Sequence, residues 1–209
     1  MLTDNIKKET IQTALLAGSS TNMIREMIGF KLAIYYGPEV MTKAGFEGRN
    51  FAANLTTISL SGTVVSVFLV DTLGRRTIML VSLTSVLFSS MYLFFQFMTP
   101  DQETGVLPFI VMNTLIFFYC LGFAATPITL NSEVHPSEFR VAGCAIAHTC
   151  GSLTALLSAI FINDWTNPNL FLLNCFFAIL GIVSTVFCVP ETKGVDLGKI
   201  NEILRKKIW

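Results

Sequence analysis

Charge is scarce in this sequence of 209 residues. Only 13% of the residues are charged, about half the share of an ordinary soluble domain, whereas 52% are hydrophobic. Acidic and basic residues balance at 14 each, which leaves no basic surplus for nucleic acid and no acidic excess for a basic partner. With a mean hydropathy of +0.62, the composition is that of a membrane protein.

Metal-binding, disulfide and catalytic motifs are also absent. The five cysteines lie in apolar runs without a CxxC pair, so we expect no disulfide framework, no metal site and no cofactor. No run holds paired catalytic carboxylates, an HExxH helix or a GxSxG elbow, so an enzyme is not expected. The polar first ten residues lead into an apolar run without an A-x-A cleavage site, which argues against a removable signal peptide.

The sequence does contain apolar runs of membrane-spanning length. Crossing about 30 Å of hydrocarbon takes roughly 20 helical residues. Six stretches approach that length, over residues 14–36, 52–70, 77–98, 105–130, 141–163 and 169–189. Lipid cannot satisfy backbone polar groups, so each run is predicted to be a helix. We therefore expect an all-α membrane protein with six transmembrane helices, followed by a tail over 190–209 whose apolar spacing favours a short amphipathic helix.

The basic residues predict how these spans are oriented. Six spans place both termini on one side, and ten of the 14 lysines and arginines lie in the termini and the two loops of that side. The opposite loops hold only Lys43 and Arg49. Basic residues stay inside, so both termini are expected in the cytoplasm. The remaining two, Arg25 and Lys31, lie within the first span.

Three charges, Arg25, Glu26 and Lys31, lie near the middle of the first span. A central Arg or Lys costs about 2.5–3.5 kcal/mol in lipid, so we expect the three to face a watery cavity or a partner. A straight helix would place Lys31 roughly 100° away from Arg25, so one narrow face cannot hold them all. Gly29 and Gly37–Pro38 are therefore predicted as helix breaks. Alternatively, Arg25 and Glu26 simply compensate each other.

Three charged segments follow the second, fourth and sixth runs: DTLGRRT at 71–77, NSEVHPSEFR at 131–140 and VPETKG at 189–194. In this order and spacing they resemble the cytoplasmic motifs of sugar porters of the major facilitator superfamily, the facilitative glucose and trehalose transporter group. The matched positions that the resemblance assigns to a cytoplasmic gate are Asp71, Gly74, Arg75, Arg76, Glu133, Pro136, Arg140 and Glu191. The resemblance covers almost the whole chain and implies the C-terminal half of such a transporter.

That resemblance implies alternating-access transport of a small solute in the lipid bilayer, with an N-terminal six-helix half as partner. The matched charges would form salt bridges that latch the gate, and exposed pairs worth about 0–1 kcal/mol would suit a latch that breaks in every cycle. Alternatively, Arg75 and Arg76 only anchor their turn. Of the two histidines, His135 is expected to be a solvated loop residue, and His148 to hydrogen-bond a neighbouring helix or to couple to protons.

The pocket positions depart from the family pattern. Where the family has glutamines and an asparagine in its first helix of this half, the alignment places Arg25, Glu26 and Lys31, followed by the retained Tyr35 and Tyr36. The other pocket positions that the resemblance implies are Ser59, Ile128, Gly151 and Ser152. Because charges replace neutral amides, the substrate is either a sugar or an anionic or zwitterionic solute.

The chain supplies only one half of such a transporter, so a fragment or half transporter is expected. It would be an integral, multi-pass protein, with the plasma membrane as the expected location. A non-transporting membrane partner is the alternative function, since a divergent half could bind another protein without moving a solute.

Overall fold

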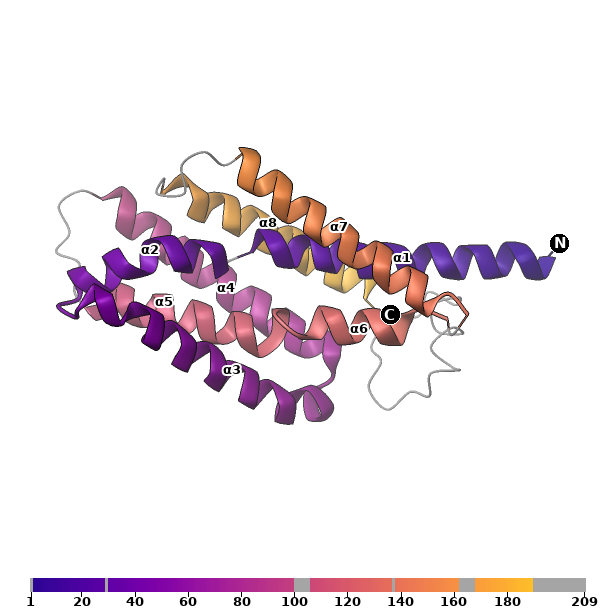
Figure 1. Ribbon diagram of the computed structural model, residues 1–209, viewed down its shortest axis with the longest axis horizontal. Coiled ribbons are helices and arrows are strands. Elements are labelled where there is room, and N and C mark those ends of the chain that lie inside the picture. The colour runs from indigo at the N-terminus through magenta and orange to yellow at the C-terminus, as the bar shows by residue number, and fades with distance from the viewer. Residues whose placement is uncertain (1, 29, 100–105, 137, 162–167, 190–209) are drawn as a thin grey trace.

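The computed structural model describes residues 2–28, 30–99, 106–136, 138–161 and 168–189. Every regular element in this part is a helix (Figure 1). The elements are α1 (Leu2–Met27), α2 (Phe30–Lys43), the 3-10 turn η1 (Gly48–Asn50), α3 (Phe51–Leu73), α4 (Arg75–Met98), α5 (Val106–Phe118), the π-helical turn η2 (Tyr119–Phe123), α6 (Thr126–Val134), α7 (Arg140–Phe161) and α8 (Asn169–Cys188).

The helices run lengthwise beside one another, and the bundle has two distinct ends (Figure 1). At one end α3 joins α4 and α6 leads into α7, and we call it the Arg75 end. The end of α2 and the start of α5 lie at the opposite end. Arg75, Arg76 and Arg140 therefore share one end of the bundle, whereas Lys43 and Arg49 lie at the other.

Five helical segments of the described part are long and apolar enough to cross a membrane. They are Gly48–Leu73, Arg75–Met98, Val106–Val134, Arg140–Ile160 and Asn169–Cys188. Their bounds lie within a few residues of the second to sixth predicted spans. The third of them combines α5, η2 and α6 into one interrupted crossing.

The first predicted span is two helices. α1 ends at Met27 and α2 begins at Phe30, where the amide of Phe30 donates to the carbonyl of Ile28 across a tight bend (2.9 Å). The break therefore lies beside Gly29, as the sequence predicts. The break expected at Gly37–Pro38 is wrong, because α2 continues through Pro38 to Lys43. Gly37 has no Cβ to clash with the proline ring, which removes one part of the cost; the lost backbone hydrogen bond and the crowding of the ring against the carbonyl of Ile34 remain.

A single glycine separates α3 from α4. Gly74 has φ of 95° and ψ of 155°, a backbone conformation that is essentially restricted to glycine. Its amide donates to the carbonyl of Val70 at 3.2 Å and so closes the last turn of α3. The chain can thus reverse direction at once, and Arg75 begins the next helix at the Arg75 end.

The π-helical turn η2 brings α5 close to α4. The amide of Ala124 donates to the carbonyl of Tyr119, five residues earlier, at 2.9 Å. The Ser82 hydroxyl of α4 donates to the carbonyl of Phe118 at 2.7 Å, next to the point where the helical pattern changes. Gly122 lies against the Ser82 side chain and leaves no room for a Cβ. Such bulges in a helix re-aim the side chains that follow.

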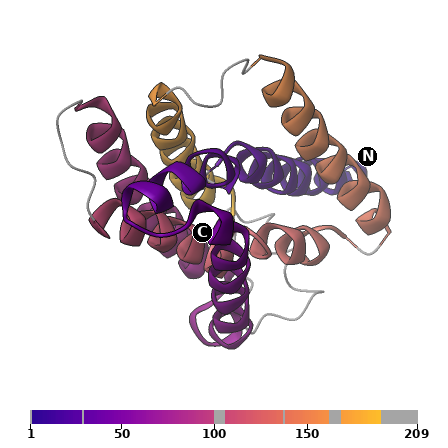
Figure 2. The same ribbon diagram turned by 60° about the vertical axis from the view of Figure 1, so that its left-hand side comes forward.

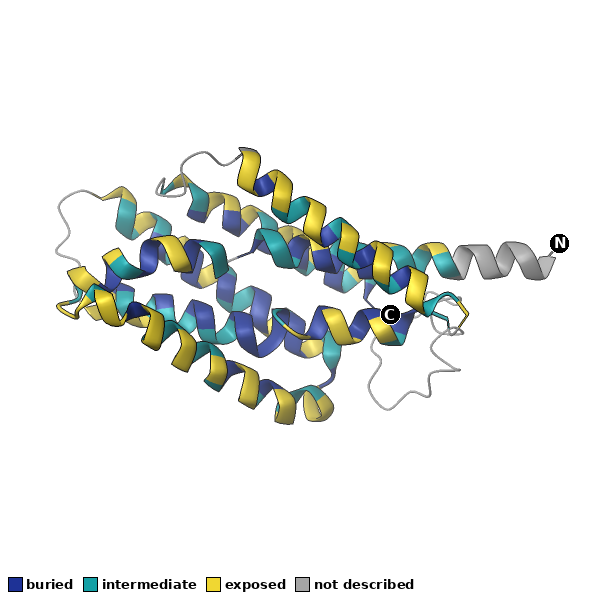
Figure 3. Ribbon diagram, viewed as in Figure 1, coloured by how far each residue is buried: buried dark blue, intermediate teal, exposed yellow. Residues whose placement is uncertain are grey.

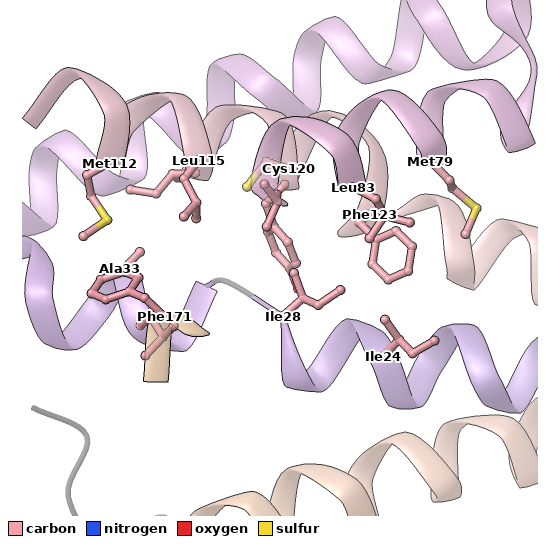
Figure 4. Packing of buried hydrophobic residues seen from close by; sticks show 14 of the residues in the cluster. Ile24, Ile28, Ala33, Met79, Leu83, Met112, Leu115, Cys120, Phe123 and Phe171 are labelled. Atoms are coloured by element: carbon pink, nitrogen blue, oxygen red, sulfur yellow. The ribbon is translucent and has the colours of Figure 1, made fainter. Parts of the chain in front are cut away.

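The hydrophobic core lies between α1, α2, α4, α5, η2 and α8 (Figure 4). Its labelled members are Ile24, Ile28, Ala33, Met79, Leu83, Met112, Leu115, Cys120, Phe123 and Phe171. The two least buried spans are those of α3 and α7, which lie on different flanks of the bundle (Figures 2 and 3). Their exposed leucine, valine and phenylalanine side chains are compatible with a lipid environment.

Candidate functional site

The charged segment lies where α1 ends. Arg25 occupies the last turn of α1, where the negative end of the helix dipole stabilises a cation. Its guanidinium contacts the carboxylate of the adjacent Glu26 at 2.7 Å, and the two side chains are 20% and 24% exposed. The pair therefore compensates its own charge within one turn, which lowers the cost of placing it in the middle of a span.

Tyr119 of η2 supports the end of α1, a role that the sequence analysis did not predict. Its hydroxyl donates to the backbone carbonyl of Arg25 at 3.2 Å, and its ring stacks on Phe30 with centroids 5.8 Å apart. The break leaves the last carbonyls of α1 without their usual helical donors, and Tyr119 provides one. Nothing in the local sequence around Tyr119 signals this contact, which depends on how η2 packs on α1.

Lys31 lies on α2, beyond the break. Its ammonium donates to the hydroxyl of Ser158 on α7 at 3.0 Å, and Ser158 donates in turn to the carbonyl of Ala155 at 2.8 Å. No carboxylate pairs with Lys31 among the residues that the structure describes. Lys31 therefore adds one uncompensated positive charge to this region, at the start of α2 where the helix dipole is also positive.

The two tyrosines of the predicted pocket have different environments. Tyr36 lies in the core, where its ring packs against Phe97 and Phe171 at centroid distances of 5.0 and 4.8 Å. Tyr35, on the neighbouring face of α2, is half exposed. Tyr36 thus anchors α2 to α4 and α8, while Tyr35 lies at the surface of this half.

The remaining pocket positions lie on three other helices. Ser59 of α3 donates to the carbonyl of Thr56 in its own helix at 3.1 Å, and Ile128 of α6 is 42% exposed. Gly151 of α7 is buried against Asn22, where α1 and α7 approach each other closely, and Ser152 is exposed. The side-chain contacts observed near the break between α1 and α2 are made by Arg25, Glu26, Lys31, Tyr119 and Ser158.

Arg75 connects three elements at the Arg75 end of the bundle. Its guanidinium contacts the carboxylate of Asp71 on α3 and that of Glu133 on α6, each at 3.2 Å. Arg75 and Glu133 are 19% and 22% exposed, whereas Asp71 is 78% exposed. The first and second charged motifs of the sequence are thus brought together, and the pair with Glu133 is the more shielded of the two.

The other basic positions of this end bind backbone carbonyls. Arg76 donates to the carbonyl of Val186 on α8 at 2.8 Å, and Arg140 donates to that of His135 at 3.5 Å. Both contacts fasten the end of one helix to its neighbour. Pro136 lies between α6 and α7. Glu191, like the predicted amphipathic tail, lies outside the described residues.

His135 differs from the expectation of a solvated loop residue, which is wrong. Its side chain is 1% exposed, and Nδ1 lies 2.7 Å from the carbonyl oxygen of Asn131, itself fully buried. The ring contacts glycines on two other helices, Gly18 of α1 and Gly143 of α7. The local sequence around His135 reads as a polar loop and gives no sign of burial. The ring is buried because glycines on α1 and α7 leave room for it.

Comparison with known proteins identifies the family. The family model described as "Sugar (and other) transporter" matches residues 2–204. The chain belongs to this sugar transporter family. It is thus a multi-pass integral membrane protein, and its surroundings are membrane lipid.

Several curated relatives match most of the chain. It is 28% identical over 207 residues to the sugar transporter ERD6-like 11 of Arabidopsis thaliana, over 91% of this chain and 42% of that protein. It is 26% identical over 205 residues to glucose transporter type 3 of Drosophila melanogaster, over 95% of this chain and 40% of that protein. The chain therefore spans about two fifths of the length of these relatives.

Solved structures show the fold. The proton:xylose symporter XylE bound to 6-bromo-6-deoxy-D-glucose, a major facilitator protein, superposes with a TM-score of 0.78 at 20% identity, covering 91% of this chain and 42% of that one. The inward-open conformation of XylE from E. coli gives a TM-score of 0.73 at 22% identity. This sugar transporter family member thus has the all-α fold of one half of a major facilitator protein.

Proposed function

We propose that the chain is the C-terminal six-helix half of a sugar-porter-type transporter, and that it moves a small solute by alternating access together with an N-terminal six-helix half. The observation that carries the proposal is the Arg75 contact to both Asp71 and Glu133, because it joins two of the three charged motifs at one end of the bundle. Two further observations support a partner half. The chain spans about two fifths of the length of its relatives, and the spans of α3 and α7 are largely unburied.

The Arg75 end is assigned to the cytoplasmic side, and the plasma membrane is the expected location. Arg75, Arg76 and Arg140 all lie at this end, and basic residues are retained on the cytoplasmic side of a membrane. The ion pairs of Arg75 would then close the cytoplasmic gate. Partly exposed pairs suit this role, because each can break and re-form at a cost of roughly 1 kcal/mol.

The centre of the half favours a substrate with a negative charge, either anionic or zwitterionic. Arg25 is neutralised by Glu26, whereas Lys31 donates to the Ser158 hydroxyl and pairs with no carboxylate among the described residues. The start of α2 adds the positive end of a helix dipole at the same place, as at other transporter sites that use interrupted helices. A sugar would instead be bound by neutral hydrogen-bonding groups. The net positive charge of this region therefore favours a charged substrate over a sugar.

The proposal is tested by reconstitution. The chain is co-expressed with an N-terminal half from a family member, purified and placed in liposomes, and uptake of a radiolabelled hexose is compared with uptake of small carboxylates and amino acids. We expect uptake only when both halves are present, and carboxylate or amino acid uptake above that of hexose. A pair of halves that assembles without moving any solute would favour the non-transporting partner instead.

Substitutions at Lys31 and Lys43 separate a substrate contact from a general charge effect. Both residues lie on α2, but Lys43 is exposed and pairs with Glu39 at the opposite end of the bundle. Lys31→Gln is expected to lower uptake of the charged solute at least tenfold, because about 1.4 kcal/mol of lost interaction is a factor of ten. Lys43→Gln should leave it within about twofold. Equal effects of the two would exclude Lys31 from substrate binding.

A further inference from the structure

A groove of about 380 Å³ runs along α1 between α7 and α8, and we call it the α7–α8 groove. α1 forms its floor, α8 forms one wall, and Thr154 of α7 contributes to the other. None of the residues that carry the charged centre or the Arg75 ion pairs lines it. A groove of this size can hold a small ligand, and the proposed transport does not use it.

The groove exists because two consecutive helices pack on a third one. α7 packs mainly on α1, and α8 packs mainly on α4 and α1, so α7 and α8 lie on either side of α1 (Figure 2). Two glycines permit these approaches: a Cβ at Gly151 of α7 would lie 3.4 Å from Asn22, and one at Gly181 of α8 would lie 3.1 Å from Ile24. The side away from α1 is open, because Met23 on the floor is 42% exposed.

The lining of the groove selects an apolar occupant. Its three hydroxyl groups all donate within the protein: Ser184 to the Ser20 hydroxyl at 3.0 Å, Ser20 to the carbonyl of Ala17 at 3.3 Å, and Thr154 to that of Cys150 at 2.9 Å. The other lining side chains are methionine, isoleucine, leucine, valine and phenylalanine. A sugar or a carboxylate would lose its hydrogen bonds to water there and find no side-chain donor in exchange.

The depth of the groove matches one leaflet of a bilayer. Ser20 and Met27, at its two ends on α1, are seven residues apart, or about 10 Å along the helix axis. Ser184 lies level with Ser20 and four residues before Cys188, the last residue of the α8 span, which adds about 6 Å. The groove therefore ends about 16 Å from the Arg75 end of α8, and one leaflet contributes about 15 Å of the ~30 Å hydrocarbon core.

We propose that the α7–α8 groove binds one acyl chain of a phospholipid from the leaflet at the Arg75 end, with the methyl end of the chain next to Met27. The groove contacts such a chain from three sides, so the chain makes more dispersion contacts there than on the convex flank of α3. Met23 and Met27 suit this role, because flexible thioether side chains adapt to an irregular apolar ligand. The inference goes beyond the proposed transport function and does not depend on it.

Photo-crosslinking tests the proposal. The 209-residue chain is placed in phosphatidylcholine nanodiscs that contain a small fraction of phosphatidylcholine with a diazirine, either near the ester or near the methyl end of one chain, and adducts are located by mass spectrometry. We expect the probe near the methyl end to label Met27 and Phe177, and the probe near the ester to label Val183. Adducts in the groove should exceed those on Val67 and Phe68 of α3 several-fold, although these two side chains are 66% and 70% exposed.

Two neighbouring substitutions on α7 provide the blocking variant and its control. Thr154→Phe places a ring in the groove and should lower the adducts on Met27 and Phe177 several-fold. Leu153→Phe, at a residue that is 53% exposed and does not line the groove, should leave them unchanged. If Thr154→Phe does not fold, Val183→Phe blocks the groove from α8 instead. Adducts that persist in the folded blocking variant would overturn the proposal.

Three other results would also overturn it. Equal labelling of the groove and of the α3 flank would mean that lipid only surrounds the protein and binds nowhere in particular. Loss of the groove adducts when the N-terminal half of a family member is co-expressed would assign the groove to the interface between the halves. A reversed order of depth would mean that the chain enters from the opposite leaflet. None of these results depends on whether the reconstituted halves move a solute.

Discussion

The two ion pairs of Arg75 should differ strongly in energy although both distances are 3.2 Å. For the shielded pair with Glu133, an effective dielectric constant of about 20 gives a gross attraction of about 5 kcal/mol. For the pair with Asp71, which is mostly exposed, a water-like value near 80 gives only about 1 kcal/mol. After the costs of desolvation and side-chain ordering, we expect net couplings of about 1–2 kcal/mol for Glu133 and below about 0.5 kcal/mol for Asp71.

Double-mutant cycles measure these couplings directly. One cycle combines Arg75→Gln with Glu133→Gln, and the other combines Arg75→Gln with Asp71→Asn. The free energy of unfolding is obtained from SDS titration in mixed micelles, followed by circular dichroism. The two cycles share the Arg75 variant, so its contact with the Val70 carbonyl cancels between them. A coupling for Asp71 equal to or larger than that for Glu133 would refute the argument that shielding determines the strength of the pairs.

Three further predictions, the first with a matched control substitution, are tested by the same unfolding measurement. Gly143→Ala should destabilise the protein by about 1–3 kcal/mol because the added methyl group overlaps His135. In the control, Gly151→Ala, the added Cβ would lie 3.4 Å from Asn22, so the stability should stay nearly unchanged. Equal effects of the two substitutions would contradict this prediction. Gly74→Ala should cost about 1–3 kcal/mol because of its backbone conformation, and an unchanged stability would show that the turn relaxes. The buried Asn174 amide donates to the Ser90 hydroxyl at 2.6 Å. Ser90→Ala removes this acceptor and should lower the free energy of unfolding by about 1–2 kcal/mol. A loss below about 0.5 kcal/mol would count against that hydrogen bond.

The break in the first span shows where local sequence suffices and where it does not. Glycine lowers helix stability at any position, and at residue 29 the helix is interrupted next to it. The same reasoning fails at Gly37–Pro38, where packing against Phe51 and the core holds the helix together. Local propensity is a difference of about 1 kcal/mol for glycine, and tertiary packing of a buried helix can exceed it.

The candidate site divides in the same way. The alignment of motifs predicted that Arg75 and Glu133 belong to one gate; the structure places the two side chains in contact, and the gate itself stays a proposal. It did not identify Tyr119 or Ser158, because a tyrosine or serine in an apolar helix carries no signal of the distant residue that it contacts. Their contacts arise where helices far apart in the chain pack together: Tyr119 contacts α1, and Ser158 contacts α2.

What the sequence determined by itself is the class of the protein and the location of its charges. Apolar runs about 20 residues long must be helices in lipid, and arginines without a compensating partner must lie at their ends, since both follow from the cost of solvating each residue. Only the tertiary structure decided that His135 is buried, that Lys31 contacts a hydroxyl instead of a carboxylate, and that Arg75 joins α3 to α6. Those outcomes depend on which helices approach one another, and glycines such as Gly18 and Gly143 permit that approach without revealing the partner.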